Sequence, residues 1–330
     1  MSEPGPVLAG QRPMIHLVGH LAPADVQDVL RLGERAAVAD GVHPLSEHVL
    51  LHLRHGGDSR SVHLLAREPG SAALLGYAHL DTTDQVAGPA AEVAVAPEAR
   101  RRGVGAALLD AIIDLEAPRA GRLRLWAHGQ DTAAARLAAA RGFRRERRLW
   151  RMHRDLADPL EPVALPPGAE LRGFRAGDED AWLALNAAAF ADLPDQGGWT
   201  RADLDRRMAE PWFDPAGFLL AHDGDGHLEG FHWTKVHGAP GHGHPPVGEV
   251  YVVGVHPRRR GAGLGRALTL AGLHHLRAAG LGEAMLYVDA GNHAATRLYA
   301  SLGFTVRDSD SLFRRPSPAG PAAGPPGGGA

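Results

Sequence analysis

Two glycine-rich turns of the same pattern, Arg-x-x-Gly-x-Gly, begin at Arg100 and at Arg260. Each follows a Val- and Ala-rich segment that ends at a proline, Pro97 or Pro257, and each leads into a helical pattern. Glycine lets the backbone approach a ligand closely, and the unpaired N–H groups of a helix N-terminus suit a pyrophosphate. One Gly-x-Gly is weak evidence, but two copies in the same strand–turn–helix context predict two phosphate-binding turns.

The repeat extends beyond the turns. Residues 123–126 match the segment around 285–287, and residues 136–143 match residues 297–304 in order. The chain is therefore two copies of one fold, and the differences between the copies indicate where chemistry takes place.

Hydrophobic periodicity predicts the elements that position these turns. The first half, residues 14–155, is expected to have helices at 23–38 and 44–55, strands at 62–67, 72–80 and 91–96, a helix from Gly103, a strand at 122–128, a helix at 131–141 and a strand ending near Asp155. Four prolines in residues 156–168 predict a linker.

The second half, residues 169–315, repeats this order. Strands are expected at 169–175, 217–222, 228–237, 247–256 and 283–289, followed by a final strand, and helices at 178–190, at 200–210, from Gly263 and from Asn292. The Pro/Gly/Ala tail, residues 316–330, is expected to be disordered because it has nothing to bury.

Composition excludes several classes of protein. The 35 Lys and Arg against 38 Asp and Glu give a formal charge of −3, which argues against a general nucleic-acid binder. The absence of cysteine excludes disulfides, thiol nucleophiles and Cys-based metal sites. No apolar run approaches a membrane span and no signal-peptide pattern is present, so we expect a cytoplasmic protein without membrane partners, and a monomer.

Histidines are numerous, and His237, His242 and His244 lie close together. They could hold a metal ion or lie in a solvated Gly/Pro-rich loop. We favour the loop and expect no metal.

The order of elements, with Arg-x-x-Gly-x-Gly after the fourth strand, resembles the GCN5-related N-acetyltransferase (GNAT) family over both halves. The resemblance implies an α/β (α+β) fold of two tandem domains, each a mixed, mostly antiparallel sheet flanked by helices. It also implies acetyl-CoA as co-substrate. In that family the glycine turn binds the pyrophosphate and splayed central strands hold the pantetheine arm.

The resemblance assigns acetyl-CoA contacts by position in each half. In the second half they are Val253, Gly254, Val255, Arg260, Gly261, Ala262, Gly263, Leu264, Gly265, Arg266, Asn292, His293, Ala294, Ala295, Thr296 and Arg297. In the first half they are Val93, Ala94, Val95, Arg101, Arg102, Gly103, Val104, Gly105 and Ala106.

Gly254 interrupts a strand of the second half. A glycine there marks a bulge or a close ligand approach, or permits tight packing. In the family a bulge at this place presents a backbone N–H to the thioester carbonyl, and Val253 is the expected donor. The first half has no glycine in its equivalent strand.

Glu249 and Tyr299 are the expected catalytic residues. Glu249 could accept the proton of a substrate amine, directly or through water, or be an ordinary exposed Glu at a strand start. The resemblance places Tyr299 near the CoA sulfur as a proton donor; the alternative is a core aromatic. The first half has Ala138 in place of Tyr299 and Pro89 opposite Glu249, with Glu92 three residues out of step. We expect a catalytic second half and a first half that is not catalytic and may bind only acetyl-CoA.

Four segments, residues 40–47, 196–200, 230–237 and 248–255, resemble a tandem branch of the family that acetylates the cysteinyl amine of cysteinyl-glucosaminyl-inositol. The resemblance implies this small-molecule amine as substrate. Its contacts carried over by position are Glu47, Asp195, Lys235, Glu249 and Tyr287. Carboxylates and a lysine supply charge pairing and hydrogen bonds to such a substrate. The family more often has Glu in place of Asp195, and Glu47 equally suits the first turn of a helix.

Two other functions stay open. The chain could acetylate another amine, such as an aminoglycoside or a protein N-terminus, or it could bind acetyl-CoA without catalysis.

Overall fold

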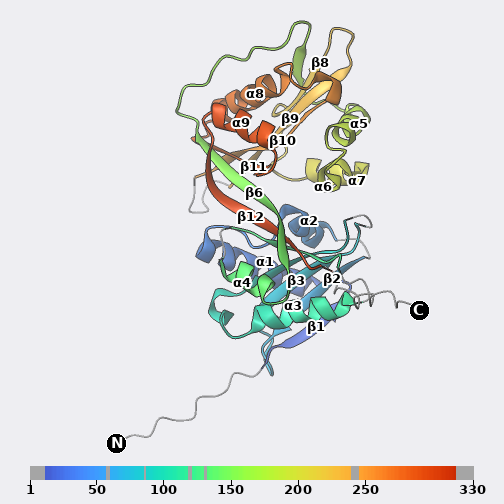
Figure 1. Cartoon of the computed structure of the whole chain (residues 1–330), viewed down its shortest axis with the longest axis vertical. Coiled ribbons are helices and arrows are strands. Elements are labelled where there is room, and N and C mark those ends of the chain that lie inside the picture. Colours follow the sequence, from blue (N-terminus) through green and yellow to red (C-terminus); the bar gives the residue numbers. More distant parts are fainter. Residues whose placement is uncertain are drawn as a thin grey trace, which may run out of the picture. The chain divides into compact units, whose positions relative to one another are not determined.

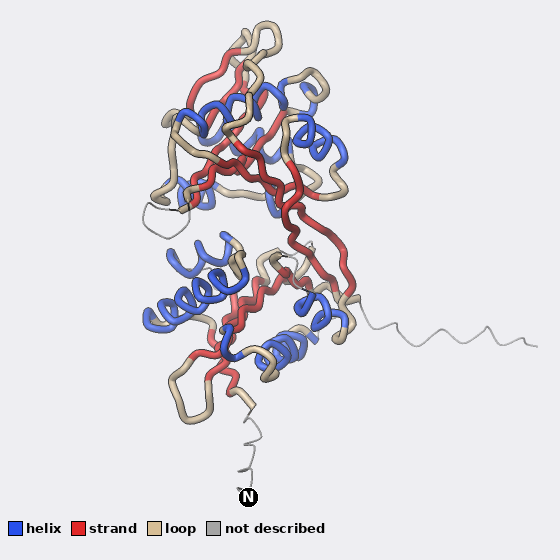
Figure 2. Tube along the Cα trace, turned by 90° about the vertical axis from the view of Figure 1, so that its left-hand side faces the viewer, coloured by secondary structure: helices blue, strands red, loops and turns tan. Residues whose placement is uncertain are grey.

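The computed structural model describes residues 12–56, 60–84, 87–117, 121–129, 132–238 and 245–316. The chain forms two compact units (Figures 1 and 2): unit 1 contains residues 1–148 and 309–330, and unit 2 contains residues 149–308. Among the helices described, none has the length and apolar character that a membrane crossing needs.

Unit 1 is a mixed sheet with the strand order β1-β2-β3-β4-β5-β12, and helices cover both of its faces (Figure 2). Its elements are β1 (Met14–Val18), α1 (Pro23–Asp40), α2 (Glu47–His55), β2 (Ser61–Arg67), β3 (Leu74–Asp81), β4 (Ala90–Val95), the 3₁₀ turn η1 (Pro97–Ala99), α3 (Val104–Leu115), β5 (Arg124–Ala127) and α4 (Thr132–Ala139). Local chemistry explains the starts of the first two helices: proline stands in the first turn of α1, and Ser46 caps α2 by accepting the N–H of Val49.

Unit 2 has the strand order β6-β11-β10-β9-β8-β7. Its elements are β7 (Glu170–Gly173), α5 (Glu179–Ala189), α6 (Pro194–Gly197), α7 (Arg201–Met208), β8 (Phe218–His222), β9 (Leu228–His237), β10 (Val247–Val255), the 3₁₀ turn η3 (Pro257–Arg259), α8 (Leu264–Ala278), β11 (Glu283–Asp289) and α9 (His293–Ser301). The predicted elements are confirmed to within a few residues at most ends; β1 and α6 were not predicted.

Two long strands, β6 (Arg144–Asp155) and β12 (Thr305–Arg314), divide between the units. Residues 149–155 of β6 pair with β11 in unit 2, and residues 311–314 of β12 pair with β5 in unit 1. Each sheet therefore contains a strand segment from the other sequence repeat. The boundaries 14–155 and 169–315 follow the repeat, whereas the compact units exchange these strand segments. Pairing satisfies the N–H and C=O groups that an unpaired edge strand would expose.

The proline-rich segment 156–168 packs along unit 2. Leu156 is buried and its N–H bonds to the carbonyl of Gly282, while Arg154 donates to the carbonyl of Pro159. The segment is extended and without helix or strand, as expected from its prolines.

The repeats differ most in the cores beneath their central strands. In unit 2, Phe218 lies opposite Trp233 across the β8–β9 ladder, and both rings are fully buried. In unit 1, His63 lies opposite His79 at the matching place on β2 and β3. The Nδ1 atom of His63 lies 2.7 Å from the hydroxyl oxygen of Tyr77, which is also buried. Unit 1 therefore has two imidazoles where unit 2 has a phenyl ring and an indole.

Burial keeps these imidazoles neutral. Burial lowers the pKa of His63 to about 4 and that of His79 to about 3, because a charged ring would lose its hydration. A neutral buried imidazole still needs hydrogen-bond partners, and His63 finds one in Tyr77.

We expect His63→Phe, which copies Phe218, to flatten the pH dependence of stability. Between pH 6.5 and 4 the unfolded wild-type chain takes up a proton at His63 and the folded chain does not, so the free energy of unfolding falls as pH falls. The substitution removes roughly 2 kcal/mol of that decrease in the free energy of unfolding. His63 also lines a pocket of about 280 Å³. Urea unfolding of both proteins at pH 7 and pH 4.5 measures the free energy of unfolding. Equal pH dependence in the two proteins would contradict a neutral, buried His63.

Candidate active site

The central parallel strands of unit 2 part after the third residue of each strand. β10 and β11 share two residue pairs, Gly248↔Ala284 and Glu249↔Met285, and in these fully described strands no later pair joins them. β10 remains paired with β9 as far as Val255. Parted strands leave backbone N–H and C=O groups without a strand partner, which suits an extended ligand that lies between them.

Glu249 lies at the last pair before the strands part. The residue is 6% exposed, and its Oε2 atom lies 2.6 Å from Nε2 of His237 on β9. Because a carboxylate only accepts hydrogen bonds, the imidazole donates here. Lys235 is the direct partner of Glu249 across the β9–β10 ladder. A carboxylate, an imidazole and an ammonium group therefore come together where the strands separate.

Aromatic rings hold the Lys235 side chain. Its Nζ atom lies 4.8 Å from the ring centroid of Trp212 and 5.1 Å from that of Tyr251, and the lysine is 8% exposed. Aromatic faces attract a cation, most strongly where water is excluded. The Tyr251 hydroxyl accepts a hydrogen bond of 2.8 Å from Nε of Arg207 on α7. This packing restricts Lys235 to the side of the sheet that carries Glu249.

The bulge in β10 lies at Tyr251, and the prediction of an irregularity at Gly254 was wrong. The ladder with β9 shifts register between Val250 and Val252, which makes Tyr251 the extra residue. Gly254 instead pairs with Phe231, and a Cβ atom there would come within 2.4 Å of the Phe231 ring. Close packing therefore accounts for this glycine.

The bulge also changes the alignment of the two repeats. Glu249 pairs with Lys235, which lies five residues after Gly230 on β9. Ala90 pairs with Asp81, which lies five residues after Gly76, the counterpart of Gly230 on β3. Ala90, rather than Pro89, therefore stands where unit 2 has Glu249. Glu92 lies opposite His79 and is therefore not the counterpart of Glu249, as the sequence predicted.

Both glycine turns lead into a helix, as the sequence predicts. Gly263 has a φ of +85° and caps α8, and Gly261 has a φ of +80°. In unit 1, Gly103 caps α3 with a φ of +81°, but Arg101 has a φ of +62° at the place of Gly261. This left-handed conformation costs about 1–2 kcal/mol for a residue with a Cβ atom.

The predicted acetyl-CoA residues of unit 2 occupy three consecutive structural features. Residues 253–255 end β10, residues 260–263 form the turn, and residues 264–266 begin α8. Residues 292–297 form the start of α9, where the Asn292 side chain accepts the N–H of Ala295. In unit 1, residues 93–95 end β4, residues 101–103 form the turn and residues 104–106 begin α3.

The arginines of the turns have intramolecular partners. Arg260 donates to the carbonyl oxygen of Ala189 at 2.8 Å, and Arg266 bonds to Glu161 and Ser301. In unit 1, Arg102 lies 3.3 Å from Glu68. These exposed contacts are weak enough to be exchanged for a phosphate.

Tyr299 is partly buried on α9 and packs edge-on against Phe304, with ring centroids 5.9 Å apart. Burial raises the pKa of Tyr299 to about 12. The phenol therefore keeps its proton at neutral pH and can donate it. Its counterpart, Ala138, is fully buried and has no proton to give.

The other predicted substrate residues are more scattered. Tyr287 lies on β11 two residues beyond the last pair with β10 and is 39% exposed. Glu47 is the first residue of α2 in unit 1, a position that also suits a helix-start carboxylate. Asp195 lies in α6, but its side chain is outside the described part. His242 and His244 also lie outside the described residues.

Sequence reasoning missed His237, Trp212, Tyr251 and Arg207 as neighbours of the site. For His237 a signal existed, because alternate residues of a strand share a face and His237 follows Lys235 by two positions. The other three depend on long-range packing and on the bulge.

Comparison with known proteins follows the two units. The model of the acetyltransferase (GNAT) family matches residues 180–304, and the model of the acetyltransferase (GNAT) domain matches residues 59–145. A tandem GNAT protein from the clavulanic acid biosynthesis pathway has a TM-score of 0.70 at 22% identity, covers 93% of this chain and 100% of its own, and supports the fold alone. The predicted tandem GNAT fold is confirmed.

Several similar proteins share one name. A mycothiol acetyltransferase of Acidothermus cellulolyticus is 55% identical over 308 residues, which cover 90% of this chain and 93% of that protein. One from Streptosporangium roseum is 49% identical and covers 90% and 98%. A solved GCN5-related N-acetyltransferase from Sphaerobacter thermophilus is 26% identical, with a TM-score of 0.66 and coverage of 92% and 96%.

Gly254→Ala tests whether this glycine serves packing. The added methyl group would force the Phe231 ring to move, and we expect a loss of stability of about 1–3 kcal/mol. The double variant Gly254→Ala/Phe231→Leu should recover part of that stability in thermal unfolding. Gly282→Ala is the control, because an added Cβ atom there would meet nothing within 4 Å and Gly282 lies outside the predicted acetyl-CoA contacts. A Gly254→Ala protein of normal stability that no longer binds acetyl-CoA would refute the packing role.

Proposed function

The chain belongs to the mycothiol acetyltransferases, a tandem branch of the acetyltransferase (GNAT) family, and we propose that its unit 2 transfers the acetyl group of acetyl-CoA to the cysteinyl amine of cysteinyl-glucosaminyl-inositol. The observation that carries the assignment to unit 2 is the position of Glu249. This carboxylate lies at the point where β10 and β11 part, bonded to His237 and opposite Lys235.

Glu249 acts on the amine. An α-amino group has an ordinary pKa near ~8, so much of it is protonated at neutral pH and must lose a proton before it attacks a carbonyl. Glu249 accepts this proton, directly or through one water molecule, and His237 holds the carboxylate in place. The cation Lys235 beside them binds hydroxyl or carbonyl oxygens of the substrate.

The start of α8 binds the phosphates of acetyl-CoA. Gly263 begins the helix without a side-chain cap, so backbone N–H groups of the first turn point outward toward an anion. The backbone N–H of Val253, at the end of β10, is the proposed donor to the thioester carbonyl, where negative charge develops.

Tyr299 acts on the leaving group. When the thioester C–S bond breaks, the sulfur leaves as a thiolate, and the protonated phenol of Tyr299 donates its proton to it. The raised pKa of Tyr299 keeps the donor protonated over the whole working pH range.

Substrate contacts follow the family by position: Glu47, Asp195, Lys235, Glu249 and Tyr287. Unit 1 supplies neither a Glu249 equivalent, since Ala90 stands there, nor a Tyr299 equivalent, since Ala138 stands there. Its glycine turn is intact in geometry, which supports a role in binding acetyl-CoA without turnover.

The test is acetyl transfer with a panel of amines. Release of CoA is followed with cysteinyl-glucosaminyl-inositol, an aminoglycoside and a peptide with a free N-terminus. We expect kcat/KM for the first to exceed the others by at least ~100-fold, because polar groups of the site would be left unpaired by the wrong amine. Glu249→Gln corrects for background release. Equal rates with the aminoglycoside would favour the alternative of another amine, and no release at all would favour a binding protein.

Tyr299→Phe should lower kcat while leaving the fold intact. The ring and its contact with Phe304 remain, so the melting temperature should stay near the wild-type value. Loss of the proton donor should lower kcat by at least ~10-fold; the effect should not exceed the low end of the ~10²–10⁴-fold typical of a general acid, because a thiolate is already a fair leaving group. Steady-state kinetics at pH 7 and 9 measure this. Wild-type kcat in the folded variant would make Tyr299 a packing residue.

A further inference from the structure

A buried cluster of charged side chains joins three strands of unit 1. His128, which directly follows β5, lies between two carboxylates: its Nε2 atom is 3.3 Å from Oε2 of Glu92 on β4, and its Nδ1 atom is 3.0 Å from Oδ2 of Asp310 on β12. All three side chains are about nine-tenths buried. The ring of Trp126 stacks on His128 at 6.3 Å between centroids.

The cluster is charged at neutral pH. Burial alone would lower the pKa of His128, but its bonds to Asp310 and Glu92 raise it to about 10. Burial would raise the pKa of Glu92, but the contacts with His128 and Ser46 lower it to about 2. One imidazolium therefore links two carboxylates, and the backbone N–H of Gly129 bonds to the other oxygen of Asp310 at 2.9 Å. Buried charges persist where they are paired and hydrogen-bonded in this way.

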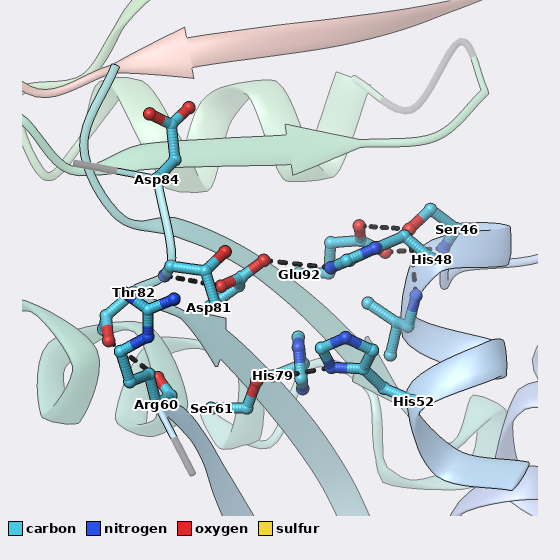
Figure 3. A network of polar contacts seen from close by, with 12 residues as sticks. Ser46, His48, His52, Arg60, Ser61, His79, Asp81, Thr82, Asp84 and Glu92 are labelled. Atoms are coloured by element: carbon cyan, nitrogen blue, oxygen red, sulfur yellow. Dashed lines mark hydrogen bonds and ion pairs between the residues drawn. The ribbon is translucent and has the colours of Figure 1, made fainter. Parts of the chain in front are cut away.

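Glu92 also holds the start of α2 (Figure 3). Its two carboxylate oxygens accept the backbone N–H and the hydroxyl of Ser46, each at 2.6 Å. Ser46 is the N-cap of α2, so Glu92 bonds the residue at which the helix begins. The helix therefore starts from a carboxylate whose own position depends on His128 and Asp310.

Further polar contacts attach the rest of α2 to the sheet. His48 lies 2.9 Å from Asp81 on β3, and His52 lies 3.3 Å from the hydroxyl of Ser61 on β2 (Figure 3). Directional hydrogen bonds define the place of a helix more narrowly than apolar contact does.

We propose that His128 is a positioning residue for substrate binding: with Asp310 it holds Glu92 on the N-cap of α2 and so sets the position of Glu47. This rests on the proposed role of Glu47 as a substrate contact. Glu47 directly follows Ser46, so any movement of the N-cap moves Glu47 with it. A carboxylate that reads amine or hydroxyl groups loses binding when its position shifts by a fraction of an ångström.

The effect should fall on substrate affinity. Glu249 and Tyr299 lie in unit 2, so a change in the cluster of unit 1 leaves the chemical step unaltered. A variant that raises KM for one substrate and leaves kcat unchanged has lost uniform binding of that substrate. A cluster that only stabilised unit 1 would lower the melting temperature and leave the KM of the folded protein unchanged.

The main variant is Asp310→Asn, which keeps the shape of the side chain and removes its charge. We expect KM for cysteinyl-glucosaminyl-inositol to rise ~5–10-fold, the loss expected when one charge-assisted contact is weakened. KM for acetyl-CoA and kcat should stay within ~2-fold of wild type. Asp84→Asn is the matched control: it removes the charge from another ion pair of unit 1, in which the carboxylate lies 2.9 Å from Arg124, and it should leave all three constants unchanged.

Ser46→Ala is the second variant in case the charged cluster cannot be altered without unfolding. It removes one of the two bonds to Glu92 and keeps the backbone bond. It should show the same rise in KM at a smaller size. Unchanged KM in folded Asp310→Asn and Ser46→Ala proteins would overturn the proposal.

Glu47→Gln separates this proposal from the proposed function. If Glu47→Gln itself leaves KM unchanged, the role of Glu47 is wrong and the positioning proposal fails with it, while acetyl transfer by unit 2 stands. If Glu47→Gln raises KM but Asp310→Asn does not, only the positioning role is refuted. If both raise KM and the double variant is no worse than Glu47→Gln alone, the two residues act through one contact, as we propose.

Discussion

The separation of β10 from β11 after Glu249 is the constraint on which the site depends. Parallel strands usually stay paired along their length, since each unpaired backbone group costs free energy. Here the pairing stops after two residue pairs. The structure tolerates the loss of these hydrogen bonds because β9 continues to pair with β10, and β6 continues to pair with β11. The backbone groups that face the gap can then bond to a ligand, and Glu249 lies at the residue pair where the gap begins.

Unit 1 shows the same strands put to another use. β4 and β5 remain paired as far as Glu92↔Trp126, one pair longer than their counterparts in unit 2. His128, two residues after Trp126, then forms an ion pair with Glu92 and links the two strands. The core below carries imidazoles in place of phenylalanine and tryptophan. In unit 1 the central strands therefore hold α2 through buried charges and hydrogen bonds.

The sequence was sufficient for the features that local chemistry determines. The helix starts at the paired glycine turns and nearly every helix and strand follow from periodicity and turn residues. The bulge at Tyr251 could not be predicted from the sequence, because the register of a strand depends on the residues of its partner strand. The same holds for the His128 cluster, whose members are separated by 36 and 182 positions in the chain. The prediction of a bulge at Gly254 was wrong because the sequence does not distinguish a glycine that packs against a neighbouring ring from a glycine at a bulge.

The exchange of strands explains why the two repeats form one protein. Residues 311–314 close the sheet of unit 1 beside β5, and residues 149–155 close that of unit 2 beside β11. Separating the chain into its two repeats at the segment 156–168 would leave β5 without residues 311–314 and β11 without residues 149–155, and such unpaired edges favour association and aggregation. It would also remove Asp310 from His128 and so leave Glu92 held on one side only. Each unit therefore contains strand residues from the other repeat, and in unit 1 the carboxylate that bonds the N-cap of α2 depends on the last strand of the chain.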